Sequence, residues 1–209
     1  TDAILHVIRC FEDDNVTHVD GSIDPIRDKE IIDTELQLKD LETVESRLAK
    51  VEKQAQTGGD KQAALLAGVL RAYHEVLIKG QNARTVTFEK AEEREAAKGL
   101  FLLSAKPVLY VCNVNDADAV KGNRYTEAVA EAARADGAEF MIVAAKTESE
   151  IAEFEDYEER KIFLNELGLE ESGVNRLIRS AYSLLNLETF FTTGSDESRA
   201  WTFTKGSKA

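Results

Sequence analysis

An apolar run that ends in a polar turn constrains the fold of this chain more than any other stretch. Pro107 opens the run, and five of the next six residues, 108–113, are apolar. Because apolar and polar residues do not alternate, the run is typical of a strand covered on both faces, as in a parallel sheet. The chain then turns through Asn113, Asn115 and Asp116. Open α/β sheets bind ligands outside the carboxyl ends of their strands, so we expect any site here.

The turn carries two groups that a purine site needs. An Asn amide can bridge neighbouring loops and face N7 of a purine, and a carboxylate can accept hydrogen bonds from N1–H and the exocyclic amine of guanine. Asn113 and Asp116 supply these groups. Asn and Asp are also favoured in ordinary turns after a strand, so the motif alone leaves a purely structural role open.

A second short apolar strand is expected within residues 139–146, and it ends in Ala144, Ala145 and Lys146. Small residues there let backbone N–H groups approach the edge of a purine ring. The ending resembles the Ser-Ala-Lys motif of GTPases, with Ala144 in place of Ser. A helix from near Asn123 or Tyr125 to about Asp136 separates the two strands, so both motifs fit one βαβ unit.

Composition limits the class of protein. The 26 Lys and Arg against 39 Asp and Glu give a net charge of −13, which argues against broad, charge-driven binding of nucleic acid. Cys10 and Cys112, the two cysteines, each lie in an apolar run and are interpreted as buried, reduced thiols. No apolar run approaches the length of a membrane helix. We therefore expect a soluble, intracellular protein.

Residues 28–104 have a different, helical pattern. Leu41, Val44, Leu48 and Val51 follow the 3-4-3 spacing of a coiled-coil seam, and Asp60 is placed to cap a return helix with a matching apolar stripe. The pattern predicts an antiparallel hairpin. A third helix is expected to follow, with Thr87 as a cap, and to run through residues 89–103. The arm could act as a lever or partner surface, or be a passive insertion, and its charges are interpreted as a solvated face.

Three further segments complete the pattern. Amphipathic helices are predicted over residues 156–167 and 172–185, with Ser172 as a cap for the second. Residues 188–194 and 199–204 alternate as a β-hairpin would. Near the start of the chain, His18 lies in a polar loop after an apolar strand at residues 3–10, where it could position a water or be an ordinary loop histidine.

Several separate stretches resemble one family, the YchF/Obg-like ATPases, in the Obg branch of the translation-factor P-loop NTPases. The matching stretches are residues 7–16, 31–36, 106–115, 166–173, 191–194 and 199–202. The likeness covers essentially the whole chain. It implies a central segment that lacks the P-loop and most of the TGS domain.

The resemblance implies a domain order. Residues 1–27 would belong to the nucleotide-binding G domain, 28–104 to a helical coiled-coil insertion, 105–187 to the base-recognition half of the G domain, and 188–209 to the start of a β-rich TGS domain. The expected fold class is α/β, with part of a P-loop NTPase parallel sheet interrupted by the antiparallel coiled-coil arm.

The resemblance also implies roles for residues. It assigns Asn113, Val114 and Asn115 to the surroundings of the purine, and Ala144, Ala145 and Lys146 to a second base-contacting loop. Family members usually end the first motif in Glu, and a missing Lys is associated with accepting ATP over GTP. Val114 stands at the Lys position, but Asp116 replaces Glu, and Asp is the acid of guanine-specific GTPases. ATP remains the favoured substrate because the Lys is missing.

The family further implies a catalytic role for a loop histidine that positions the attacking water, and this residue matches His18. Nothing in the 209 residues resembles the G-x-x-x-x-G-K-[ST] phosphate loop or a Mg²⁺-binding Thr. We therefore expect the Mg²⁺ ligands outside this segment, and we expect the segment alone to be inactive as an NTP hydrolase.

These expectations favour a cytoplasmic, ribosome-associated P-loop NTPase that hydrolyses ATP, or also GTP, and acts as a conformational switch in translation or stress response. The link to the large ribosomal subunit comes only from the resemblance. The alternative is a non-catalytic coiled-coil scaffold with a vestigial nucleotide site.

Overall fold

The computed structural model describes residues 1–13, 22–58 and 60–207. The chain divides into two compact units. The first combines Thr1–Arg27 with Pro107–Ala209, and the second is Asp28–Lys106.

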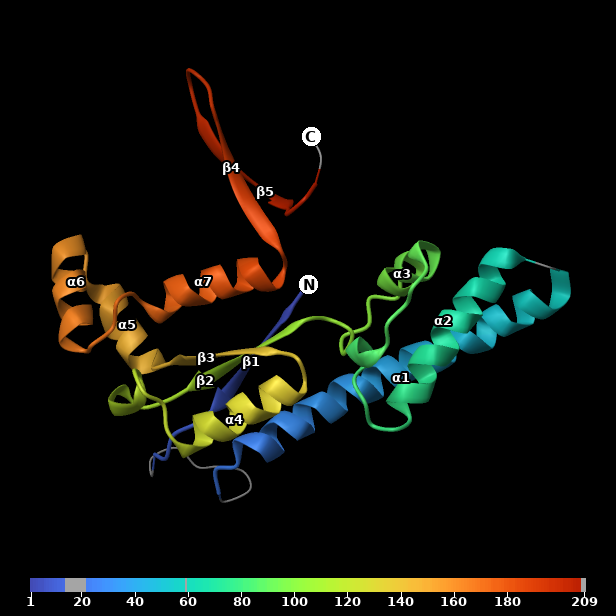
Figure 1. Cartoon of the computed structure of the whole chain (residues 1–209), viewed down its shortest axis with the longest axis horizontal. Helices are drawn as coiled ribbons and strands as arrows, with labels where there is room; N and C mark the ends of the chain where they lie inside the picture. Colours follow the sequence, from blue (N-terminus) through green and yellow to red (C-terminus); the bar gives the residue numbers. More distant parts are fainter. Residues whose placement is uncertain (14–21, 59, 208–209) are drawn as a thin grey trace. The chain divides into compact units, whose positions relative to one another are not determined.

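A three-stranded parallel sheet forms the centre of the first unit, as Figure 1 shows. Its strands are β1 (Ile4–Arg9), β2 (Val108–Asn113) and β3 (Glu139–Val143), in the spatial order β1-β2-β3. Helix α4 (Arg124–Ala135) connects β2 to β3, which confirms the predicted βαβ unit. The register aligns Arg9 with Asn113 and Asn113 with Val143, so the three carboxyl ends meet at one edge.

The central strand β2 is buried because helices cover both faces of the sheet. Val108, Tyr110 and Cys112 pack with residues of α4 such as Val129. The alternate residues Leu109 and Val111 instead pack in a cluster with Leu177 and Leu184 of α7 (Gly173–Leu184). This burial on both faces accounts for the unbroken apolar run in the sequence. Figure 1 shows α4 and α7 on opposite faces.

The helices that follow β3 have local caps. Asp156 caps α6 (Tyr157–Glu166) by accepting hydrogen bonds from the backbone of Glu158 and Glu159. Ser172 caps α7 by accepting one from Asn175, which confirms the predicted cap. Helix α5 (Ala145–Glu153) was not expected from the sequence.

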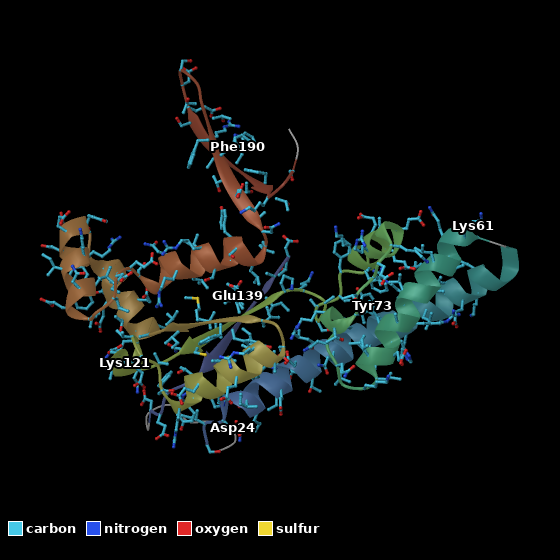
Figure 2. The ribbon with its side chains drawn as sticks, viewed as in Figure 1. Asp24, Lys61, Tyr73, Lys121, Glu139 and Phe190 are labelled. Atoms are coloured by element: carbon cyan, nitrogen blue, oxygen red, sulfur yellow. The ribbon has the colours of Figure 1, made fainter. Side chains whose placement is uncertain are left out.

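The first unit ends in an antiparallel hairpin of β4 (Leu187–Thr193) and β5 (Ser198–Thr204), where the alternating pattern predicted one. Phe190 on β4 (Figure 2) is paired in register with Trp201, and both residues are 46% exposed. The assignment of this hairpin to a TGS domain stays a prediction.

The second unit contains most of α1 (Pro25–Gly58), then α2 (Lys61–Leu77), a 3₁₀ turn η1 (Ala83–Thr85) and α3 (Ala91–Lys98). Asp60 caps α2 as expected, by accepting hydrogen bonds from the backbone of Gln62 and Ala63. Val44 and Val51 of the predicted seam pack against buried α2 residues such as Leu70. The two apolar stripes therefore share one core, and the coiled-coil character of the arm stays a prediction.

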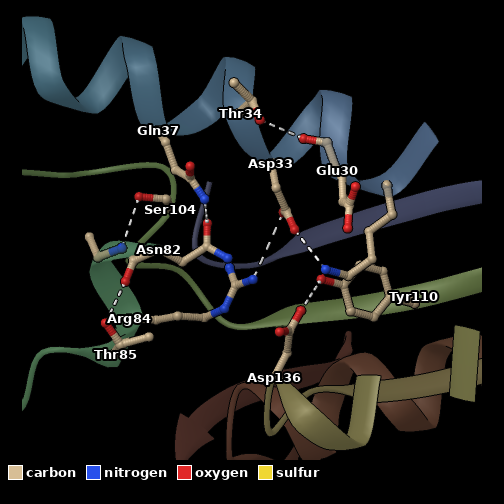
Figure 3. Close-up of polar contacts among 12 residues, drawn as sticks. Glu30, Asp33, Thr34, Gln37, Asn82, Arg84, Thr85, Ser104, Tyr110 and Asp136 are labelled. Carbon is tan, nitrogen blue, oxygen red and sulfur yellow. Dashed lines mark hydrogen bonds and ion pairs between the residues drawn. The ribbon is translucent and has the colours of Figure 1, made fainter. Parts of the chain in front are cut away.

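Buried polar side chains continue the seam toward the start of α1, where the sequence analysis expected a solvated face. The residues are Lys29, Asp33, Gln37 and Asp40, all with 9% exposure or less. Their spacing of four, four and three residues keeps them on one side of the helix. Lys29 Nζ donates to Asp33 Oδ2 at 2.8 Å. Gln37 Nε2 donates to the side chain of Asn82 at 2.9 Å, as Figure 3 shows.

Asp40 accepts three hydrogen bonds within this unit. Its carboxylate accepts hydrogen bonds from the backbone N–H groups of Leu103 and Ser104, at 2.7 and 2.6 Å, and from the Ser104 hydroxyl at 2.6 Å. Ser104 Oγ in turn accepts a bond from the backbone of Ala83 at 3.1 Å. One buried acid thus fixes a segment more than sixty residues away.

The third helix is shorter than predicted, and Thr87 does not cap it. Helix α3 covers only Ala91–Lys98, and its N-cap is Lys90, without a side-chain hydrogen bond. After Gly99 the chain passes through Phe101 at a φ of 55°, a left-handed conformation that ends helices. The backbone N–H groups of Leu103 and Ser104 bind Asp40 instead of helix carbonyls.

Among the residues that the structure describes, no helix combines the length and apolar character that crossing a bilayer requires.

Candidate nucleotide-base site

A hydrogen bond joins the two predicted motifs at the carboxyl edge of the sheet. Asn113 Oδ1 accepts it from the backbone N–H of Ala145, at a distance of 3.0 Å. Beside it, the backbone N–H of Val114 donates to the carbonyl of Val143 at 2.9 Å. The turn after β2 and the end of β3 are therefore held together, as the parallel register requires. The remaining donor of the Asn113 amide, Nδ2, is the group that could face N7 of a purine.

The second motif begins a helix and does not form the loop that the sequence analysis expected. Ala145 and Lys146 lie in the first turn of α5, after Ala144 at the N-cap. Thr147 and Ile151, four residues apart, are both buried and anchor the helix, and Glu148 supplies a favourable acid in its first turn. Backbone N–H groups in a first helical turn lack intrahelical partners. Asn113 satisfies that of Ala145.

Asp116 lies within reach of two side chains from α5. The hydroxyl of Thr147 donates to Asp116 Oδ1 at 2.6 Å, and Lys146 Nζ is 4.0 Å from Asp116 Oδ2. Thr147 is 2% exposed, whereas the Asp116 side chain is 45% exposed. Thr147 was not among the predicted site residues, because its contact with Asp116 depends on the parallel pairing of β2 with β3.

The other predicted residues differ in their exposure. The side chains of Val114 and Ala144 are buried in the core on the α4 side of the sheet, both at 4%, so only their backbone could reach a base. Asn115 and Lys146 are exposed. The structure thus brings together Asn113, Asp116 and Lys146 as the polar groups of this edge.

An open cleft of about 490 Å³ borders the turn on its other side, with Asn115 in its lining. Glu12, which follows β1, accepts hydrogen bonds there from the Tyr125 hydroxyl at 2.5 Å and from Arg124 at 2.9 Å. The bond from Tyr125, followed by the charge and hydrogen bond of Arg124, lowers the pKa of the Glu12 carboxyl. These contacts fasten the segment after β1 to the start of α4.

Asn123 holds three segments together beside this cleft. Its Nδ2 donates to the carbonyl of Cys10 at 2.8 Å and to Asp118 Oδ2 at 2.7 Å. Its Oδ1 accepts from the backbone of Tyr125 and Thr126 and caps α4. The base turn is therefore linked to the end of β1.

The two cysteines are buried free thiols. A hydrogen bond with the Cys112 thiol, together with burial, raises the pKa of the Cys10 thiol well above its ordinary value. The Cys10 thiol is therefore protonated at neutral pH.

Two expectations concern groups beyond this edge. His18 lies outside the described residues. Among the residues in the described ranges, no three His, Cys, Asp or Glu side chains converge as a metal site would require.

Comparisons with known proteins bear on the whole chain. No family model matches it. It is 48% identical over 210 residues to the ribosome-binding ATPase YchF of Bacillus subtilis, covering 100% of this chain and 57% of that protein. It is 46% identical over 209 residues to the protein of the same name from Haemophilus influenzae, covering 56% of it. Obg-like ATPase 1 of Rattus norvegicus is 37% identical over 219 residues.

A solved structure supports the same relationship. The Schizosaccharomyces pombe YchF GTPase matches with a TM-score of 0.86 and 31% identity, covering 100% of this chain and 56% of that one. The chain therefore spans little more than half the length of the relatives that it matches.

Proposed function

Because this chain belongs to the YchF/Obg-like ATPase family, we propose that it carries the base-recognition half of a ribosome-associated NTPase that binds and hydrolyses ATP, with GTP as the second candidate substrate. Relatives named as ribosome-binding ATPases support the nucleotide and the ribosome as partners. The chain covers 57% of the Bacillus relative, so we propose the activity for the full-length protein.

The hydrogen bond between Asn113 and Ala145 is the observation that carries this proposal. It gives the Asn amide a fixed orientation, with Oδ1 used by the protein and Nδ2 left to donate to N7 of a purine. Asp116 then supplies an acceptor for donors on the six-membered ring, and Lys146 approaches the same carboxylate. The Asn113 amide thus offers a donor to the purine, and the Asp116 carboxylate offers an acceptor.

We propose that residues outside this segment bind the phosphates of the nucleotide. A phosphate loop and a Mg²⁺ ion supply most of the stabilisation of a phosphoryl-transfer transition state. Among the described residues, no three His, Cys, Asp or Glu side chains converge as a metal site would require. We propose that the Mg²⁺ ligands lie elsewhere, that the 209-residue segment alone does not hydrolyse nucleotide, and that His18 positions water in the full-length protein.

The remaining parts would couple nucleotide state to a partner. The helical second unit would be the coiled-coil arm, and the β4–β5 hairpin would begin the TGS domain, as the family resemblance implies. Hydrolysis would then switch a cytoplasmic protein between conformations on the large ribosomal subunit, in translation or stress response.

Equilibrium competition of ATP against GTP, with Mg²⁺ and the full-length protein, tests the proposal. We expect ATP to be preferred, and we expect Asn113→Ala to lose affinity by about tenfold, as removal of a buried polar contact does. Asp116→Glu tests the acid, and the exposed Asn165→Ala in α6 is the matched control. Absence of binding to either nucleotide would favour the non-catalytic coiled-coil scaffold.

A further inference from the structure

The orientation of Asp116 depends on a residue outside both motifs. Thr147 is almost fully buried, and its hydroxyl donates to Asp116 Oδ1 at 2.6 Å. A hydrogen bond this short from a buried group limits rotation of the carboxylate about its Cβ–Cγ bond. The Asp116 side chain itself is 45% exposed, so its other lone pairs remain accessible to a ligand.

The carboxylate keeps enough acceptor capacity to bind two donors. Each carboxylate oxygen accepts about two hydrogen bonds, so Oδ1 retains one lone pair after binding Thr147, and Oδ2 retains both. Lys146 Nζ, at 4.0 Å from Oδ2, is too far for a hydrogen bond but keeps positive charge near that oxygen.

We propose that Thr147 is a positioning residue that sets the affinity of this site for GTP, because its hydroxyl holds the Asp116 carboxylate in the rotation that reads two donors of guanine. The proposal rests on the proposed function, since it concerns the same base site. A carboxylate held in this rotation binds guanine even though the first motif lacks Lys.

The two purines respond differently to a fixed carboxylate. Guanine presents two parallel donors, N1–H and the exocyclic amine, which pair with both oxygens only when the carboxylate has the correct rotation. Adenine presents one donor, its exocyclic amine, next to the acceptor N1, which gains nothing from a second oxygen. Loss of the Thr147 hydroxyl should therefore weaken GTP binding more than ATP binding.

The test measures dissociation constants of ATP, GTP and ITP, each with Mg²⁺, for the full-length protein. ITP lacks the exocyclic amine, so the ratio of ITP to GTP constants reports whether the carboxylate reads two donors. Thr147→Val keeps the buried shape without the hydroxyl. We expect it to weaken GTP on the order of tenfold, with a change of about twofold or less for ATP. Thr147→Ser restores a hydroxyl and should restore the GTP affinity.

Each outcome has a distinct meaning. Equal loss for ATP and GTP in Thr147→Val, or no rescue by Thr147→Ser, would overturn the role of Thr147 and leave the nucleotide site intact. Equal binding of GTP and ITP by the wild-type protein would also overturn the role of Thr147. This comparison needs no variant, so it remains a test if Thr147→Val fails to fold. Failure of every nucleotide to bind the wild-type protein would instead overturn the proposed function.

Discussion

Asn113 Oδ1 and the backbone nitrogen of Ala145 lie 3.0 Å apart and join the turn after β2 to the first turn of α5. The two residues are 32 positions apart in sequence but meet because β2 and β3 are adjacent and parallel. The link has two separable functions in the proposed site. It braces the two segments, and it orients the amide for a base.

Asn113→Asp separates these two functions. The new carboxylate keeps an acceptor for the Ala145 N–H but replaces the Nδ2 donor with an oxygen that repels N7 of a purine. We expect affinity for both ATP and GTP to fall by about tenfold or more, while the melting temperature changes little. Competition binding and calorimetry on the full-length protein measure the two quantities. Binding at wild-type strength would show that the amide makes no contact with the base.

Asp40→Asn tests the buried acid of the second unit. The Asp40 carboxylate accepts three hydrogen bonds, and the Asn amide replaces one of its oxygens with an NH₂ donor. At least one of the three bonds is therefore lost at a residue that is 2% exposed. We expect a loss of about 3 kcal/mol in the free energy of unfolding. Hydrogen exchange of the Leu103 and Ser104 amides should accelerate.

The matched control for this prediction is Glu35→Gln, which removes an acid from the exposed side of the same helix. Its free energy of unfolding should stay within about 0.5 kcal/mol of the wild type. Unchanged exchange at Leu103 and Ser104 in Asp40→Asn would contradict the proposed importance of this network.

Leu70→Ala tests the shared core of the two apolar stripes. Leu70 is fully buried, so its removal leaves a cavity and should cost about 2–5 kcal/mol in the free energy of unfolding. Leu38→Ala makes the same chemical change on α1, where the side chain is 61% exposed, and should cost much less. Denaturant unfolding of both variants measures the difference. Equal costs would mean that the apolar seam does not hold the helices together.

Local signals explain which elements could be predicted from the sequence. Strand β2 was predicted correctly from the apolar run before Asn113. Three helix starts were predicted correctly because a polar residue stands next to each, at Asp60, Asp156 and Ser172. The apolar seam through Val44 was predictable for the same reason, because helical spacing is a property of the sequence alone.

Contacts between distant segments explain what could not be predicted. By sequence alone, Lys29, Asp33 and Asp40 were assigned to a solvated face, whereas the structure buries them and supplies partners such as Ser104, 64 positions from Asp40. The early end of α3 has the same cause. Thr147 gains its importance only because parallel pairing of β2 and β3 brings α5 to Asp116, 31 positions earlier.

The pH dependence of Glu12 provides the last test, since its carboxylate joins the segment after β1 to α4. The hydrogen bond from Tyr125, then Arg124, lowers the pKa of Glu12 below its ordinary value of 4.5. A group whose pKa is lowered by folding stabilises the folded state above pH 4.5, and this stabilisation is lost as the pH falls through the lowered value.

Tyr125→Phe removes the largest cause, so the pKa of Glu12 should rise toward 4.5. The stability difference between wild type and variant should then shrink as the pH falls below 4.5, because protonated Glu12 no longer gains from the phenol. Titration of the Glu12 carboxyl by nuclear magnetic resonance measures the shift directly. Tyr157→Phe, on the exposed surface of α6, should leave the titration unchanged. An identical Glu12 pKa in Tyr125→Phe would show that the phenol does not hold this carboxylate in solution.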